Sequence, residues 1–205
     1  AQTVERCRAA GVHIGAHPGF PDLMGFGRRN MNVSPAEAKA YIQYQLGALL
    51  AFCRASGVSM HHVKPHGALY NMAAKDEKLA RAIVEGICEV DDRLTLLALS
   101  GSEMLLAAEK AGLRAASEVF ADRAYQANGT LVPRSQPGAM ITDENEAIAR
   151  VVRMVTEGVV TSIDGIDVPL RADSICVHGD GAKALLFVQK IRAALEEKGV
   201  ALKAL

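Results

Sequence analysis

The sequence of 205 residues predicts an α/β fold in which parallel strands alternate with helices. A helical segment, a glycine and a short apolar strand recur along the chain, which is typical of repeated βα units. Leu94–Leu99 is wholly apolar, as expected of a strand buried on both faces of a parallel sheet. Right-handed crossovers would close such a sheet into a barrel or wind it as an open sheet, and the residues favour neither. The recurring junctions are Gly11-Val12, Gly57-Val58, Gly112-Leu113 and Gly199-Val200.

Composition narrows the classes of function. Hydrophobic residues make up 50% of the chain, enough for one domain over residues 1–205. Lys+Arg and Asp+Glu balance at 23 each, and aromatic residues are only 4%, which argues against nucleic acid and an anionic membrane surface as partners. No apolar run approaches the roughly 20 residues that cross a bilayer. Four widely spaced cysteines without a Cys-x-x-Cys pair indicate reduced thiols in a cytoplasmic protein.

Local signals place the elements. Ser34-Pro35-Ala36-Glu37 is a capping box with proline at the first helical position, Ser100 and Glu103 repeat its spacing, and Asp164-Gly165 indicates a hairpin turn. The expected helices cover Thr3–Ala10 (ended by Gly11), Ser34 to about Ala55, roughly Ala73–Glu89, Ser100 to Gly112, Thr142 to Gly158 and a last segment ending at Gly199. The expected strands cover Val12–His17, Val58 to Pro65, Leu94–Leu99, a part of Arg114–Arg123, Ser174–His178 and, as a short strand, Val200–Leu205. We expect loops over Phe20–Asn32 and Arg123–Gly138 and a hairpin over Val159–Leu170.

The segment Val58–Tyr70 carries the densest chemistry. Period-two alternation puts His62, Lys64 and His66 on one face of its strand. Pro65 donates no backbone hydrogen bond, so we expect the strand pairing to stop there. Lys64 and His66 then lie at the carboxyl end of a strand, where α/β proteins build their sites. The alternative is a lysine that caps a carbonyl and a histidine satisfied within a loop.

Other strand ends carry polar residues as well. In a parallel barrel these ends converge on one rim, where histidines, a lysine and carboxylates suit metal-assisted or acid/base hydrolysis. Each has a structural alternative: a loop contact for His17, a helix cap for Asp180, and an ion pair with Lys64 or Arg123 for Glu118. The residues at the strand ends are His17, Lys64, His66, Ser100, Glu118 to Arg123, His178 and Asp180.

Arginines form a second group of candidates. Arg28 and Arg29 lie in a glycine-rich loop, and Arg123 and Arg134 flank the Tyr125–Val132 loop. Such arginines suit a carboxylate or a phosphate through bidentate contact. Solvated loop charges are the alternative for Arg28, Arg29 and Arg134. No Gly-x-x-x-x-Gly-Lys-Ser/Thr phosphate loop is present, so any nucleotide would be held in another way.

Five motifs together resemble the LamB/YcsF family over nearly the whole chain. They are Gly15-Ala-His-Pro-Gly19, Pro21-Asp-Leu-x-Gly-Phe-Gly-Arg-Arg29, Val63-Lys-Pro-His-Gly-Ala-Leu-Tyr-Asn71, Glu118-Val-Phe-Ala-Asp-Arg123 and Val177-His-Gly-Asp180. The resemblance implies an incomplete, seven-stranded (β/α) barrel similar to that of polysaccharide deacetylases. It also implies ATP-driven opening of the lactam 5-oxoproline to glutamate, together with two further 5-oxoprolinase subunits, B and C.

The chain departs from the family at its start. Family members begin with a strand carrying Asp-Leu-Asn-x-Asp-x-Gly-Glu, followed by Cys-Gly-Phe-His-Ala-Gly-Asp, and neither motif is present here. We therefore expect this sequence to lack the first two strands of the family barrel, with an aspartate and a histidine of its rim.

Roles follow for the matched residues. Expected in catalysis are Lys64, His66, Glu118, Asp122 and His178; expected in substrate binding are His17, Arg28, Arg29, Arg123 and Asp180. ATP is the expected cosubstrate, and a divalent metal is a candidate cofactor with His17, His66 and His178 as candidate ligands. Two alternatives stay open: a metal-dependent deacetylase of amino sugars, and a non-catalytic regulatory or scaffolding subunit. Self-association into a homo-oligomer is also open.

Overall fold

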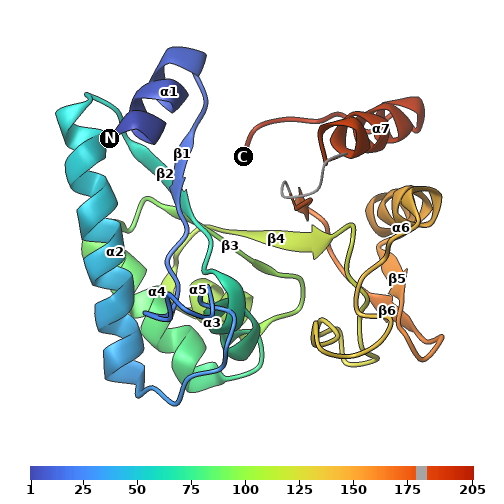
Figure 1. Ribbon diagram of the computed structural model, residues 1–205, viewed down its shortest axis with the longest axis horizontal. Coiled ribbons are helices and arrows are strands. Elements are labelled where there is room, and N and C mark those ends of the chain that lie inside the picture. The colour runs from blue at the N-terminus through green and yellow to red at the C-terminus, as the bar shows by residue number, and fades with distance from the viewer. Residues whose placement is uncertain (179–183) are drawn as a thin grey trace. The chain divides into compact units, whose positions relative to one another are not determined.

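The computed structural model describes residues 1–178 and 184–205 and has an α/β architecture (Figure 1). Its helices are α1 (Gln2–Ala10), α2 (Pro35–Ala55), α3 (Gly67–Ala73), α4 (Glu77–Asp91), α5 (Glu103–Ala111), α6 (Glu144–Thr156) and α7 (Ala184–Glu197). Its strands are β1 (Ile14–Ala16), β2 (Met60–Val63), β3 (Thr95–Leu99), β4 (Ala115–Phe120), β5 (Val159–Thr161), β6 (Asp167–Pro169) and β7 (Ser174–Cys176). None of the helices in the described part of the chain combines the length and hydropathy needed to span a bilayer.

Five strands form one sheet with the hydrogen-bonding order β1-β2-β3-β4-β7, while β5 and β6 form a separate antiparallel hairpin. The pairs β1/β2, β2/β3 and β4/β7 run parallel, and β3 is buried along its whole length. The predicted α/β class, the parallel strand pairing and the hairpin on Asp164-Gly165 are therefore confirmed. The seven-stranded barrel and its similarity to polysaccharide deacetylases stay predictions.

The first of two compact units comprises Ala1–Ala98 and Ser102–Ala116. Its core includes the interface where α2 packs against α4, which lie beside each other in Figure 1. Ile42 and Leu46 on α2 and Ile83 on α4 have no exposed surface. Burying each such side chain contributes roughly 1.5–3 kcal/mol. The amphipathic pattern of these helices thus supplies much of the stability of the unit.

Strand β2 ends at Val63, before Pro65, as predicted, but backbone hydrogen bonding to the β1 segment continues beyond the strand. The backbone N–H of Lys64 donates to the carbonyl of Ala16 at 2.9 Å, and that of His66 donates to the carbonyl of Pro18 at 2.8 Å. In a parallel pair, the N–H groups that bond to one neighbour come from alternate residues. The missing N–H of Pro65 falls between them and interrupts nothing. The ends of β1 and β2 therefore stay in register through His66.

The loop between β1 and α2 is fastened to the start of α3. The N–H of Ala68 donates to the carbonyl of Gly27 at 2.9 Å. Gly67 adopts φ 58°, and a Cβ at this position would lie 2.5 Å from the Gly27 oxygen. Gln45 on α2 holds the start of the loop, because its side chain both accepts from the N–H of Gly19 at 3.0 Å and donates to the carbonyl of Gly19 at 2.8 Å. Only glycine fits this approach at Gly67.

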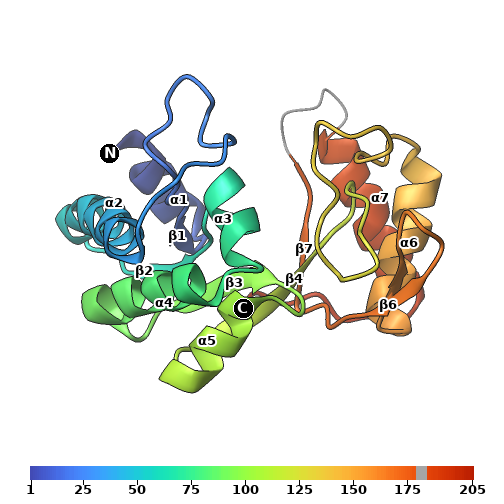
Figure 2. The same cartoon turned by 90° about the horizontal axis from the view of Figure 1, so that it is seen from below.

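The second compact unit comprises Leu99–Gly101 and Ser117–Leu205. Within it β4 pairs with β7, and α6 packs against α7, as both views show (Figures 1 and 2). Val151 on α6 and Leu195 on α7 have no exposed surface and share a cluster with Ala121, the first residue after β4. The end of β4, which carries candidate site residues, is thereby anchored by the helix pair.

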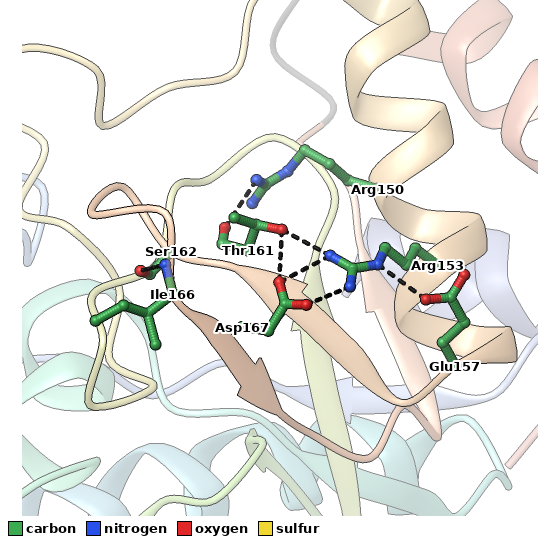
Figure 3. A network of polar contacts seen from close by, with 7 residues as sticks. All are labelled: Arg150, Arg153, Glu157, Thr161, Ser162, Ile166 and Asp167. Atoms are coloured by element: carbon green, nitrogen blue, oxygen red, sulfur yellow. Dashed lines mark hydrogen bonds and ion pairs between the residues drawn. The ribbon is translucent and has the colours of Figure 1, made fainter.

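Arg153 on α6 joins the helix to the β5–β6 hairpin (Figure 3). Its guanidinium donates to Asp167 on β6 at 2.9 Å, to Thr161 on β5 at 2.7 Å and to Glu157 at 2.9 Å. Hydrogen bonds from Arg153 and then Thr161 lower the pKa of Asp167 to about 2. The carboxylate of Asp167 is therefore held in its charged form well below the ordinary pKa of an aspartate.

Arg150, one turn earlier on α6, reaches the backbone instead. It donates to the carbonyl of Thr161 at 3.3 Å and to the carbonyl of Arg123 at 3.1 Å. Desolvation lowers the pKa of Arg150. Because Arg123 follows Asp122 directly, this contact fixes the backbone beside a candidate site residue.

The helix caps at Ser34, Gly11 and Gly112 are confirmed, but the predicted capping box at Ser100 and Glu103 was wrong. Ser102 is the N-cap of α5 and makes no side-chain cap bond. The hydroxyl of Ser100 instead accepts a hydrogen bond from the backbone N–H of Arg171 at 2.9 Å. The Ser100 hydroxyl, which the local pattern assigned to a helix cap, therefore bonds to a residue that is distant in the sequence.

Two helix starts differ from the prediction because an aspartate caps each of them. The helix expected over roughly Ala73–Glu89 is α4, which begins later than expected because Asp76 caps it by accepting from the N–H of Leu79 at 3.0 Å; the separate short helix α3 precedes it. Asp143 rather than Thr142 caps α6, accepting from the backbone N–H three residues later at 2.8 Å. The carboxylate oxygen is the stronger acceptor beside a helix N-terminus.

The short strand expected over Val200–Leu205 was wrong. The segment has no strand assignment and is largely exposed. Its first N–H, from Val200, closes the end of α7 by donating to Leu195 at 3.0 Å. The recurring junction Gly199-Val200 is a weak signal by itself, because a strand forms only where a neighbouring strand can pair with it.

We predict that Gly67→Ala destabilises the chain by roughly 3 kcal/mol, because left-handed strain adds to the clash with the Gly27 carbonyl. Gly57→Ala is the matched control, since Gly57 has φ 67° and a Cβ placed there would have nothing within 4 Å. The control carries only the backbone strain, about 1 kcal/mol. Urea unfolding of both variants measures the difference, and equal losses would contradict the clash.

We further predict that Arg153→Met lowers Tm by a few degrees near neutral pH but has little effect near pH 2. A depressed aspartate pKa contributes stability that is present above 3.8 and lost as pH falls toward about 2. Arg192→Met, which removes an exposed helical pair with Glu196, serves as control. Thermal unfolding between pH 2 and pH 7 measures the effect; a pH-independent loss for Arg153→Met would contradict it.

Candidate functional site

The first unit brings His17 and His66 into direct contact at the ends of β1 and β2. We call them the histidine pair. Nδ1 of His66 lies 2.9 Å from Nε2 of His17. The two outer nitrogens meet backbone carbonyls: Nδ1 of His17 lies 2.6 Å from the Lys64 oxygen, and Nε2 of His66 lies 2.8 Å from the Phe26 oxygen. The predicted proximity of His17, Lys64 and His66 is present in this unit.

These contacts determine where the protons of the histidine pair lie. A carbonyl only accepts, so both outer nitrogens are donors. The two inner nitrogens share a single hydrogen bond, in which one nitrogen donates and the other accepts. Desolvation, followed by the nearby His66 and Lys64, lowers the pKa of His17, while its bond to the Lys64 carbonyl opposes the shift. This favours a neutral His17 that accepts from His66.

Phe26 completes the surroundings of His66. It is the described non-glycine residue with positive φ, 53°, and its ring meets the His66 ring edge-on at 5.3 Å between centroids. The Arg28 guanidinium lies 5.4 Å from the centroid of the Phe26 ring, and the Lys64 ammonium lies 6.0 Å from the Tyr70 ring. A cation–π contact with Phe26 therefore holds the Arg28 guanidinium near the ring that packs on His66.

Arg29 has a different role, because it is paired with Asp22. The Asp22 carboxylate is nearly buried, accepts from Arg29 Nε at 3.0 Å and also accepts from the N–H of Gly25 at 3.0 Å. Hydrogen bonding from Arg29 lowers the pKa of Asp22 to about 2. This ion pair shapes the loop between β1 and α2. Sequence reasoning missed Asp22, although its place in a glycine-rich turn ahead of two arginines was an available signal.

The second unit contains an Asp–His–Arg cluster made of Asp122, His178 and Arg134. Nδ1 of His178 lies 2.7 Å from Oδ2 of Asp122, and a terminal nitrogen of Arg134 lies 3.0 Å from Nε2 of His178. A guanidinium only donates, so Nε2 carries the lone pair and Nδ1 donates its proton to Asp122. Asp122 therefore selects the tautomer of His178 and orients its ring, the arrangement seen wherever a carboxylate positions a catalytic base.

Arg123 and Glu118 are both buried in the second unit. Arg123 is 4% exposed, and its guanidinium donates to the carbonyls of Val132 at 2.6 Å and Ala139 at 3.4 Å. Desolvation, with a further contribution from Arg134, lowers the pKa of Arg123 to about 10. Glu118 is 2% exposed on β4. The guanidinium of Arg123 thus holds the ends of the loop that carries Arg134.

Tyr125 is another residue that sequence reasoning missed. Its hydroxyl accepts from the N–H of Phe120 at 2.9 Å, directly at the end of β4. Burial raises the pKa of Tyr125, so the phenol stays protonated. The predicted substrate-binding residue Asp180 lies outside the described residues.

The candidate metal ligands are distributed over the two units, with His17 and His66 in the first and His178 in the second. Within residues 1–178 and 184–205, no three His, Cys, Asp or Glu side chains gather closely enough to hold a metal ion. The nitrogens of His17 and His66 are also engaged with carbonyls and with each other. A divalent metal at these histidines therefore stays a prediction.

Comparison with known proteins gives consistent matches over the whole chain. A protein from Clostridium beijerinckii, named as the A subunit of 5-oxoprolinase, is 67% identical over 97% of this chain and 78% of its own length. One of the same name from Bacillus subtilis is 54% identical over 100% of this chain and 79% of its own. The crystal structure of a lactam utilization protein from Thermus thermophilus matches with a TM-score of 0.88 and 48% identity, over 100% of this chain and 81% of that one.

The family model described as the LamB/YcsF family matches residues 1–205. This agrees with the resemblance carried by the five sequence motifs, which is confirmed. The chain belongs to the LamB/YcsF family.

Proposed function

We propose that this chain is a subunit of an ATP-dependent 5-oxoprolinase, which opens the lactam of 5-oxo-L-proline to L-glutamate. The observation that carries the proposal is the match along the entire chain to proteins named as the A subunit of 5-oxoprolinase, at up to 67% identity. The name of these relatives also supports partner subunits, and we propose that subunits B and C complete the enzyme. Its place would be the cytoplasm, where ATP is available and free cysteines such as the four of this chain persist.

The chemistry requires activation, because a lactam is a resonance-stabilised amide. In the proposed sequence the lactam oxygen attacks the γ-phosphorus of ATP, and ADP leaves. Water then adds to the activated carbon and gives up a proton to a base. The carbon–nitrogen bond breaks as the nitrogen is protonated, leaving an acyl phosphate that a second water hydrolyses to glutamate and phosphate. Both water additions need a base, and the departing nitrogen needs an acid.

The Asp–His–Arg cluster supplies the base in this proposal. Nε2 of His178 carries a lone pair, and Asp122 fixes the opposite nitrogen at 2.7 Å. As His178 takes a proton from water, the Asp122 carboxylate stabilises the imidazolium that forms. Asp122 is thus a positioning residue, and the proton acceptor is His178.

The first unit supplies binding groups. We propose that the Lys64 ammonium stabilises negative charge on phosphate or on the lactam oxygen and that Arg28 contributes to anion binding from its place over Phe26. The histidine pair holds Phe26 and Lys64 through their carbonyls.

Glutamate formation from 5-oxoproline tests the function directly. The chain is mixed with its candidate partner subunits, and glutamate is measured with and without ATP. We expect ATP-dependent glutamate that disappears when this chain is omitted. An assembled complex that forms no glutamate would contradict the proposal. Acetate release from an N-acetyl amino sugar by the same preparation would favour the deacetylase alternative instead.

We predict that Asp122→Asn lowers kcat of the complex about 10²- to 10⁴-fold with little change in KM, because the amide would favour the wrong tautomer of His178. Asp164→Asn is the matched control: Asp164 is exposed in the hairpin turn, and Asn-Gly suits that turn equally well. Steady-state kinetics measures both. A loss confined to KM, or the same loss in the control, would count against the role of Asp122.

A further inference from the structure

Arg134 makes its described side-chain contacts with acceptors that are not carboxylates. It is exposed in the loop between β4 and α6. Among the described residues, its guanidinium contacts the Nε2 of His178 at 3.0 Å and the sulfur of Met140 at 3.2 Å. Both acceptors are uncharged, and among the described residues no carboxylate forms an ion pair with it. A guanidinium held by a neutral imidazole and a thioether is free to exchange them for a stronger acceptor.

The other predicted anion-binding arginines are engaged differently. Arg29 is paired with the buried carboxylate of Asp22, and Arg123 is buried with its N–H groups on the carbonyls of Val132 and Ala139. In the second unit, Arg134 is therefore the candidate arginine that is exposed and able to turn toward a ligand. The positive charge of Arg134 also disfavours the charged form of its neighbour Arg123, a repulsion that a bound anion would relieve.

The same contact keeps His178 from acting as a base. Its Nδ1 donates to Asp122, and its Nε2 lone pair accepts from Arg134. A nitrogen whose lone pair is already occupied cannot take a proton from water. His178 becomes a base only after the Arg134 guanidinium has moved away.

We propose that Arg134 binds the carboxylate of the substrate and that this movement releases Nε2 of His178 for catalysis. The inference rests on the proposed function, because 5-oxoproline carries one carboxylate beside its lactam ring. A bidentate guanidinium–carboxylate contact is stronger than either present contact of Arg134. Recognition of the substrate and activation of the base then become one event, and a lactam without a carboxylate would leave the base covered.

The test compares the acid with its uncharged isostere. Turnover of 5-oxoproline and of its carboxamide is measured in the assembled complex, for the wild type, Arg134→Ala and Arg134→Lys. We expect the wild type to prefer the acid by roughly 10- to 100-fold in kcat/KM. Arg134→Ala should abolish that preference, mainly by raising KM for the acid, and Arg134→Lys should keep part of it. Arg192→Ala, which removes an exposed arginine on α7, should leave the preference unchanged.

The outcomes separate the two proposals. A wild-type complex that forms no glutamate contradicts the proposed function itself. A working wild type whose preference for the acid survives in Arg134→Ala contradicts the role of Arg134 alone. Equal loss of activity toward acid and amide in Arg134→Ala, with KM unchanged, would likewise overturn it, because the arginine would then serve the chemistry and not the carboxylate.

Discussion

Backbone pairing across Pro65 is the constraint on which the histidine pair depends. The N–H groups on either side of the proline donate to the carbonyls of Ala16 and Pro18, at the end of β1 and just after it, so the register of the two strands extends beyond the strands themselves. This register sets His66 against His17, 49 residues away in the sequence. A slip of one residue would turn every side chain to the other face. Pro65 occupies a position whose N–H would not bond to the β1 segment, so the hydrogen bonding continues past it. The contact between His17 and His66 depends on this placement of the proline.

Elements set by neighbouring residues could be predicted from the sequence. The capping box at Ser34 and the apolar run Leu94–Leu99 depend on residues within a few positions of one another, and both are confirmed. Ser100 shows the limit of such reasoning. The spacing to Glu103 satisfies the local rule, yet the hydroxyl of Ser100 meets the N–H of Arg171, 71 residues later. The Ser100 hydroxyl accepts from a backbone N–H that only the tertiary structure brings close. That N–H lies far away in the sequence, so a local pattern could not predict it.

The candidate site divides along the same line. The polar residues at strand ends indicated which side chains would lie close together, and Asp122 and His178 are in contact. The hydrogen-bond partners of side chains in loops could not be predicted, because a loop has no regular repeat from which the direction of a side chain follows. Arg29 is therefore found on Asp22, and Arg123, expected to bind substrate, donates to loop carbonyls. Burial decided the latter case: a guanidinium that is 4% exposed satisfies its donors from the nearest backbone.

The histidine sites differ in the property that a general base needs, a lone pair that can be released. In the histidine pair the outer nitrogens donate to backbone carbonyls and the inner nitrogens share one hydrogen bond, so releasing a lone pair breaks a contact that holds the backbone at Phe26 or Lys64. His178 gives its lone pair to an exposed side chain, which can rotate away while Asp122 keeps the ring in place. The release costs one side-chain hydrogen bond and no backbone contact. Base catalysis is therefore better supported at His178, and the histidine pair is better suited to holding the loop that it joins.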